Sequence, residues 1–312
     1  MAASPSLVLQ RSPDSAQPLK EIPLVTPSGC NFWSLTPAPV GRFAVIEWQC
    51  SYGPAVQILN VENGKAYFLL DDAGLDNRLL AWHPDGKTVY LKAGTLSNPQ
   101  VLRVNVESRQ VVPLSLSPNT YSVSVSPDGK TMQYALTNGI GLGSELWAAD
   151  AGGTYGQKIL SDFGNILGLM RYSPNGKQIA TMRLPDNQSE FPAGELWVAD
   201  VDGKNAHLAA TTDAGRGMPP VWSPDGKQIA FIGRDHPDDP DSINLSIYDL
   251  STSQLLTTSP FSLLTPPVWS LDGTKLYFTL AIDDKMEVWF YEITNGKAGR
   301  LLSKACCAGW LH

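Results

Sequence analysis

The densest group of side chains that could do chemistry is a run of carboxylates in the segment GRDHPDDPDSIN, residues 233–244. It holds four aspartates: Asp235, Asp238, Asp239 and Asp241. Carboxylate oxygens at this density are hard ligands that suit calcium. The segment lacks the Asp-x-Asp-x-Asp-Gly order and the distal Glu of an EF-hand, and its two prolines equally suit a rigid surface loop. A calcium site and a plain loop are therefore alternatives, and the sequence indicates no other cofactor.

The histidines and serines show no catalytic arrangement. The chain has no Gly-x-Ser-x-Gly elbow and no His-Glu-x-x-His zinc motif. The segment GIGLG from Gly139 lies between two expected strands, whereas a phosphate-binding loop would open a helix. Among the four histidines, His83 and His312 stand where related segments carry serine, and His207 falls in an expected outer strand. The sequence favours a protein without its own catalytic centre and leaves an enzyme as the open alternative.

Charge limits the partners of this chain. The formal net charge is -7, and no run of Lys or Arg is longer than a pair, so we expect no nucleic-acid partner. No stretch approaches the roughly 20 apolar residues of a membrane span, and the N-terminal segment lacks the features of a signal peptide. We therefore expect no direct membrane insertion, and a monomeric domain.

One phrase of eleven residues recurs along the chain and indicates how any site is positioned. VWSPDGKQIAF at Val221 returns as VWSLDGTKLYF at Val268, with related copies RYSPNGKQIAT, SVSPDGKTMQY and AWHPDGKTVYL and a degenerate copy LTPAPVGRFAVI. The turn glycines of the six copies are Gly41, Gly86, Gly129, Gly176, Gly226 and Gly273. Proline presets the backbone, Ser and Asp bond to nearby main chain, and glycine accepts positive φ. Each copy predicts a strand, a tight turn and a second strand.

Each repeat also contains a third strand, such as SELWAADAGG or GELWVADVDG, and a short apolar run that supplies a fourth. Four antiparallel strands at this period describe one propeller blade. The sequence therefore predicts an all-β fold, a β-propeller with six complete four-stranded blades at about residues 31–71, 79–116, 121–161, 167–211, 219–259 and 266–302. The strands expected in residues 1–25 and 305–312 close the ring or form a partial seventh blade, which makes residues 1–312 a single domain.

The Ser-Pro-Asp-Gly-Lys boxes followed by ELWVAD strands resemble the bacterial TolB-type propeller repeat, which also occurs in the propeller domains of prolyl oligopeptidase and tricorn peptidases. The resemblance covers residues 31–302. It implies an extracytoplasmic scaffold, periplasmic, secreted or at the cell surface, that binds proteins or peptides. It carries no set of catalytic residues onto this chain.

The four cysteines leave the pairing open. Cys30 and Cys50 flank the first hairpin, and Cys306 and Cys307 lie where the ring must close. A disulfide across the closure would link a loop of several hundred residues and contribute about 3 to 5 kcal/mol. Buried reduced thiols are the alternative. No His and Cys spacing typical of zinc accompanies the adjacent pair.

The longer, varied loops of a propeller emerge at one end of the ring, which we call the loop face, and the Ser-Pro-Asp-Gly turns emerge at the other, the turn face. Varied loops on a rigid scaffold are where binding usually resides. The residues that begin each innermost strand at the loop face should surround the axis: Arg78, Tyr121, Asn165, Arg216 and Leu264. Such a group could hold a carboxylate or a peptide end, and a water-filled funnel without a ligand is the alternative.

Two functions follow. In the first, the chain is a non-catalytic binding or scaffold propeller that presents its loop face and axial funnel to a protein, a peptide or a polysaccharide. In the second, it is the gating or substrate-selecting domain of a peptidase or hydrolase whose catalytic part is not in this chain.

Overall fold

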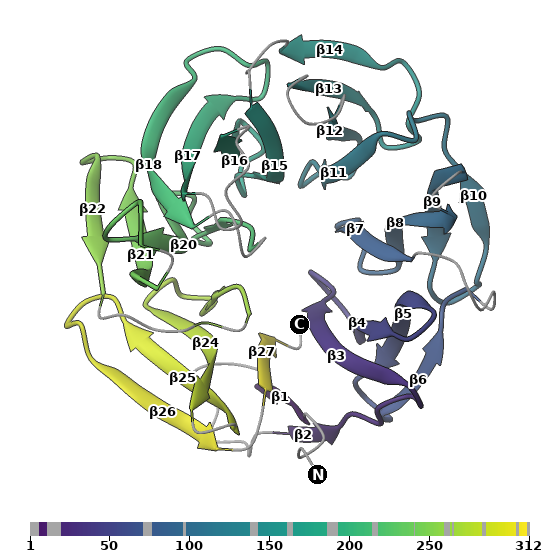
Figure 1. The fold of residues 1–312 in the computed structure, drawn as a ribbon, viewed down its shortest axis with the longest axis horizontal. Helices are drawn as coiled ribbons and strands as arrows, with labels where there is room; N and C mark the ends of the chain where they lie inside the picture. The colour runs from purple at the N-terminus through teal and green to yellow at the C-terminus, as the bar shows by residue number, and fades with distance from the viewer. Residues whose placement is uncertain are drawn as a thin grey trace.

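The protein is an all-β ring of sheets around a central axis in the computed structural model (Figure 1). The structure describes residues 6–10, 20–70, 77–95, 98–137, 143–160, 165–185, 193–213, 218–239, 241–258, 263, 265–282, 285–303 and 306–310. Over these ranges, no helix is long and apolar enough to cross a membrane. The expected fold class, a β-propeller, is confirmed.

Six units of four antiparallel strands follow one another around the ring, and we call them blades 1 to 6 (Figure 1). Blades 1 and 2 comprise β3 (Cys30–Pro37), β4 (Phe43–Cys50), β5 (Gly53–Asn60) and β6 (Lys65–Phe68), then β7 (Arg78–Trp82), β8 (Thr88–Thr95), β9 (Asn98–Asn105) and β10 (Val111–Pro113). Blades 3 and 4 comprise β11 (Thr120–Val125), β12 (Thr131–Thr137), β13 (Ser144–Asp150) and β14 (Gln157–Leu160), then β15 (Asn165–Tyr172), β16 (Gln178–Pro185), β17 (Ala193–Asp200) and β18 (His207–Asp213). Blades 5 and 6 comprise β19 (Val221–Trp222), β20 (Gln228–Arg234), β21 (Ile243–Asp249) and β22 (Gln254–Thr257), then β23 (Val268–Trp269), β24 (Lys275–Ile282), β25 (Lys285–Glu292) and β26 (Ala298–Ser303). A single bridge between Thr212 and Gly233 joins the sheets of blades 4 and 5.

The Ser-Pro-Asp-Gly boxes form the turns between the first and second strands, as the sequence predicts. In blade 5 the Ser223 hydroxyl donates to Asp225 Oδ1 at 2.7 Å and accepts from the Gln228 amide at 2.9 Å. The corresponding serines of the other boxes, Ser126, Ser173 and Ser270, repeat both bonds. In blade 2 the turn residue must be glycine, because Gly86 has a φ of 65° and a Cβ there would lie 2.0 Å from the Val40 carbonyl oxygen.

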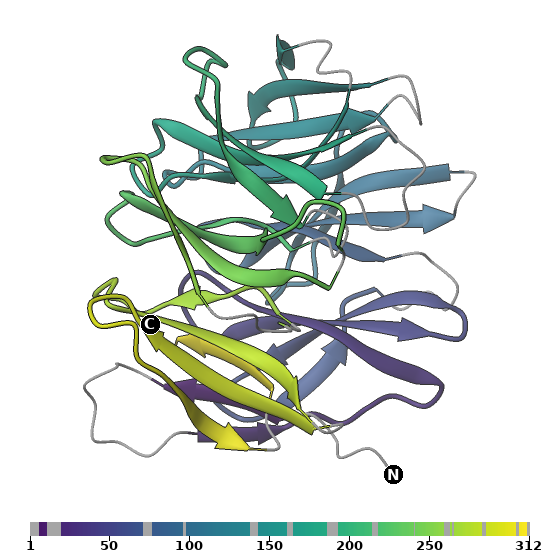
Figure 2. The ribbon, with the colours of Figure 1, turned by 60° about the vertical axis from the view of Figure 1, so that its left-hand side comes forward.

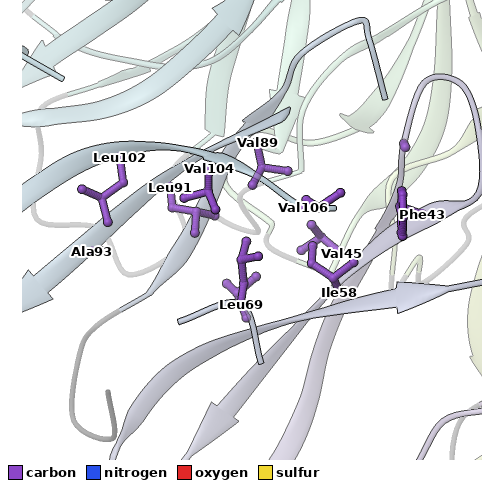
Figure 3. Packing of buried hydrophobic residues seen from close by; sticks show 12 residues of the cluster. Phe43, Val45, Ile58, Leu69, Val89, Leu91, Ala93, Leu102, Val104 and Val106 are labelled. Carbon is purple, nitrogen blue, oxygen red and sulfur yellow. The ribbon is translucent and has the colours of Figure 1, made fainter. Parts of the chain in front are cut away.

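The core consists of apolar layers between blades, because each sheet buries both of its faces against its neighbours. Figure 3 shows the layer between blades 1 and 2, where Val45 and Ile58 of one blade meet Val89 and Val104 of the next. All four side chains are fully buried. Burial of a side chain of this size stabilises the fold by about 1.5–3 kcal/mol, so the layers hold the blades at fixed angles around the axis.

Both chain ends contribute to one three-stranded sheet, formed by β1 (Ser6–Gln10), β2 (Lys20–Pro23) and β27 (Cys306–Trp310). Figures 1 and 2 place this sheet between blade 6, in yellow, and blade 1, in purple. Ile22 and Leu24 are buried in the apolar cluster of blade 1, and Met286 of blade 6 packs against the same cluster. The terminal strands therefore contact both the first and the last blade, and their sheet joins the two ends of the ring.

The closing sheet contains one parallel pair, β1 with β27, beside the antiparallel pair of β1 with β2. Strand directions alternate in an antiparallel blade, so its first and third strands run the same way. The sequence aligns β27 with the first strands of the blades and β1 with the third. Because this sheet has no second strand between them, the two pair directly and in parallel.

A disulfide joins Cys30 to Cys50 within blade 1. The two residues face each other at the ends of β3 and β4, because the hairpin between them brings both strand ends together. Of the two alternatives in the sequence, reduced thiols are therefore wrong for this pair, and these two cysteines do not bridge the closure of the ring. The side chains of Cys306 and Cys307 lie outside the described residues.

Candidate functional site: the loop face and the ring axis

The predicted site residues begin the innermost strands at the loop face, as far as the structure describes them. Arg78 is the first residue of β7 and is exposed, Tyr121 is the second residue of β11 and is half-buried, and Asn165 is the first residue of β15. These strands are neighbours around the axis (Figure 1). The side chain of Asn165 and both Arg216 and Leu264 lie outside the described residues. Ligand binding by this group stays a prediction.

Tyr121 points its hydroxyl toward its own blade. Its Oη donates to Ser144 Oγ at 3.4 Å, at the start of β13. Burial raises the pKa of Tyr121 above its usual value of 10. The phenol therefore remains neutral near pH 7, and it can offer a ligand a ring face and a hydrogen bond, and no charge.

Lys92 is a loop-face residue that the sequence analysis missed. It lies directly opposite Arg78 in the pairing of β7 with β8, and its Nζ donates to the Thr120 carbonyl oxygen of β11 at 3.0 Å. Like charges in facing positions cost stability unless other groups compensate. The sequence offered one signal, a lysine inside the apolar run TVYLKAG. Two cations thus sit together where blades 2 and 3 meet.

Glu47 links blades 1 and 2 beside this cationic pair. Its Oε1 accepts a hydrogen bond from the amide of Leu79, the residue after Arg78, at 2.9 Å. Its Oε2 accepts from the Ser34 hydroxyl at 2.6 Å. Because both carboxylate oxygens have partners, Glu47 fixes the relative position of two innermost strands, β3 and β7.

A buried ion pair fixes the loop-face ends of blades 4 and 5. The side chains of Asp213, the last residue of β18, and Arg234, the last residue of β20, are 0% and 1% exposed. Arg234 Nη2 donates to Asp213 Oδ1, and Nη1 donates to the Pro237 carbonyl oxygen at 3.0 Å. The pair therefore anchors the acidic loop that follows β20 to the neighbouring blade.

The acidic loop uses its described carboxylates to hold its own shape. Asp235 Oδ1 accepts from Asn244 Nδ2 at 2.8 Å, and Asp239 Oδ1 accepts from the amide of Asp241 at 2.9 Å. In the part of the chain that the structure describes, no group of three or more His, Cys, Asp or Glu is arranged to hold a metal ion. Calcium binding by the four aspartates stays a prediction.

At the turn face, tryptophans connect consecutive blades. Each indole N–H donates, at 3.0–3.1 Å, to a main-chain carbonyl in the innermost strand of the preceding blade: Trp82 to Thr36, Trp222 to Arg171 and Trp269 to Val221. His83 has a similar role. Its Nδ1 accepts from the Asp85 amide at 3.1 Å, so its Nε2 carries the proton and donates to the Gly129 carbonyl at 3.0 Å. The expectation that His83 is structural fits these contacts.

The ring of blades around one axis defines a β-propeller. Solved structures that resemble this chain have the same fold. No protein-family model matches the sequence, and no curated protein matches it. TolB from Acinetobacter baumannii is similar with a TM-score of 0.58 and 19% identity over 92% of this chain and 67% of that one.

Two further solved structures are similar over most of this chain. Oligogalacturonate lyase from Vibrio parahaemolyticus gives a TM-score of 0.61 and 12% identity over 96% of this chain and 85% of its own. A prolyl endopeptidase gives 0.58 and 15% over 88% of this chain and 42% of its own. Identities this low show the fold alone, so the resemblance to TolB is a structural similarity.

Proposed function

We propose that this chain is a non-catalytic binding propeller that presents its loop face and axial funnel to a protein, a peptide or a polysaccharide. The observation that carries the proposal is the facing pair of Arg78 and Lys92, beside Tyr121, at the inner end of the loop face. Two cations and an aromatic ring around an axis suit a carboxylate or a peptide end, which they can hold by charge-assisted hydrogen bonds and stacking. The whole chain carries a net charge of -7, so a pair of cations at this position is electrostatically distinct.

The disulfide and the resemblance to TolB both support an extracytoplasmic location, in the periplasm or at the cell surface. Disulfides persist in oxidising compartments and are rare in the cytosol. We therefore expect protein isolated from its native host without reductant to yield the linked peptides of Cys30 and Cys50 in mass spectrometry. Free thiols at both positions in alkylation-trapped samples would contradict this location.

The binding site is tested by removing its charges. The variant Arg78→Ala with Lys92→Met should lose at least tenfold in affinity for the partners that the wild type isolates from a host extract, as measured by quantitative mass spectrometry. The matched control is Lys130→Ala with Lys227→Ala, which removes two exposed cations from the turn face. The control should keep the wild-type melting temperature, and the first variant should keep the wild-type circular dichroism spectrum at the assay temperature although Lys92 no longer bonds the Thr120 carbonyl. Partners that survive the first change and disappear with the second would place the contact surface on the turn face instead.

One observation favours a second candidate, a propeller that gates or selects substrates for a peptidase or hydrolase. The similarity to a prolyl endopeptidase covers 88% of this chain and only 42% of that protein. The sequence of the gene beyond residue 312 separates the two functions. A hydrolase domain with a Ser, Asp and His set would favour gating, and a stop codon or further blades would favour binding.

A further inference from the structure

One register position recurs in the innermost strand of all six blades. Arg171, for example, pairs with Ala180, which is four residues after the turn glycine Gly176. In every blade, the residue that pairs with the position four after the turn glycine is equivalent to Arg171. We call these six residues the axial ring: Thr36, Ala81, Ser124, Arg171, Val221 and Val268. These positions lie close to the turn-face end of the innermost strands, because the Ser-Pro-Asp-Gly turn follows two or three residues later.

The axial ring has small or apolar side chains at five positions and a single charge. Ser124 is 5% exposed, and the other five side chains are half-buried. Ala81 and Val221 pack against the apolar layers between blades and still keep part of their surface accessible, as do the other three half-buried side chains.

The backbone places the guanidinium of Arg171 at the axial edge of β15. The pairing of β15 with β16 shifts between Gly168 and Arg171, so Met170 has no partner on β16. The Met170 amide instead donates to Ser122 Oγ of β11 at 3.4 Å. Arg171 Nη1 donates to the Met170 carbonyl oxygen at 2.8 Å. The side chain thus lies along the edge of β15 that does not pair with β16. This edge is the innermost edge of blade 4 (Figure 1).

Arg171 has no counterion among the described residues. The Met170 carbonyl is the one protein partner of its guanidinium there, in contrast to Arg234, which has a buried carboxylate. Burial lowers the pKa of Arg171 from 12.5 to about 10. A partly desolvated cation without an anionic partner costs stability, and a bound anion would offset that cost.

We propose that Arg171 is a binding site for a small oxyanion, a carboxylate or a phosphate, in the axial ring at the turn-face end. The planar guanidinium can bond two oxygens of either group with the donors that Met170 leaves unused. The site is separate from the loop-face group of Arg78 and Lys92, so it holds whether or not the proposed function does.

Thermal unfolding of the full chain at constant ionic strength tests the site. Replacing chloride with inorganic phosphate or with N-acetylglycine should raise the melting temperature of the wild type by several degrees, because a ligand that binds only the folded state stabilises it. The response should be absent in Arg171→Met. It should persist in the matched control Arg300→Met, which removes an exposed arginine that pairs with Glu287. The two anions distinguish a phosphate site from a carboxylate site.

A second measurement separates binding from a purely structural role. Without added anion, Arg171→Met should melt at the wild-type temperature or above it, because it removes a partly desolvated charge that has no counterion among the described residues. If Arg171 served only to hold the Met170 carbonyl, the variant would melt lower. A lower melting temperature, an anion response that survives in Arg171→Met, or a wild type that responds to neither anion would each overturn the proposal.

Discussion

The two ends of the ring hold their blades together in different ways. At the turn face, the same bonds recur in several blades: a serine bonds the aspartate or asparagine two residues later, and an indole bonds a carbonyl in the innermost strand of the preceding blade. At the loop face, the three junctions described above use different contacts. Blades 1 and 2 use Glu47, blades 2 and 3 use Lys92, and blades 4 and 5 use a buried ion pair.

This difference indicates how a repeat protein can diversify. At the turn face, the bonds within each box are local, so each hairpin can form without information from its neighbours. The tryptophan bonds between blades repeat one position of the box. The loop face uses a different contact at each of the three junctions described, so one change there alters one junction alone. The sequences of the loops can therefore change to suit a ligand while the repeated turns keep the ring intact.

Breaking the ion pair of Asp213 and Arg234 at the loop face should have the largest effect on the free energy of unfolding. Asp213→Ala leaves Arg234 buried without its carboxylate, and we expect the free energy of unfolding to fall by about 3 to 5 kcal/mol. Equilibrium denaturation in urea measures it. The paired change Asp213→Leu with Arg234→Met should recover most of the loss, since no charge then remains buried. A loss below about 1 kcal/mol for Asp213→Ala would show that the pair does not anchor this junction.

Breaking a turn-face contact should cost less. Trp222→Phe keeps most of the buried ring and removes the N–H that bonds the Arg171 carbonyl, so we expect a loss of about 1 to 2 kcal/mol in the free energy of unfolding. Trp147→Phe is the control, because its indole bonds Glu145 two residues away on the same strand and crosses no blade junction. Equal losses in the two variants would mean that the contact between blades adds nothing.

The smallest effect on stability should come from Asp249, a carboxylate at the turn face. The pKa of Asp249 is lowered from 3.8 to about 2, first by the Ser251 hydroxyl and also by hydrogen bonds from Thr252 and Gln228. A lowered pKa in the folded state stabilises the protein above about pH 4 and is lost as the pH falls toward 2. Wild type should therefore lose more stability between pH 4 and pH 2 than Asp249→Asn. The difference should stay below about 1 kcal/mol because the group is near solvent. Parallel acid unfolding curves would contradict this role.

The fold could be predicted almost completely from the sequence, because its signals are local. Proline, aspartate and glycine in each box, with alternating apolar residues on either side, specify a hairpin whatever surrounds it. The same reasoning placed Arg78, Tyr121 and Asn165 at the first or second positions of adjacent innermost strands. It missed Lys92 because the residue opposite Arg78 depends on the register between two strands, including an irregularity between Leu79 and Ala81.

Arg171 was missed for a related reason. It stands next to a box whose other copies carry small residues at that place, so an alignment of the repeats alone could have marked it as the single charge of the axial ring. That it has no carboxylate partner among the described residues is visible only once every neighbouring strand is in place. The cysteines show the same limit, since three connectivities of four cysteines are compatible with the sequence.

The sequence by itself determined the class of fold, the number of complete blades and the end of the ring at which the loops vary, because these follow from backbone preferences repeated within a few residues. Only the tertiary structure decided that Cys30 pairs with Cys50, that Arg234 meets Asp213, and that β1 accepts β27 in parallel across nearly the whole chain. Such contacts depend on the angle at which each blade packs on the next. That angle results from the summed burial of many apolar side chains, and no short stretch of sequence specifies it.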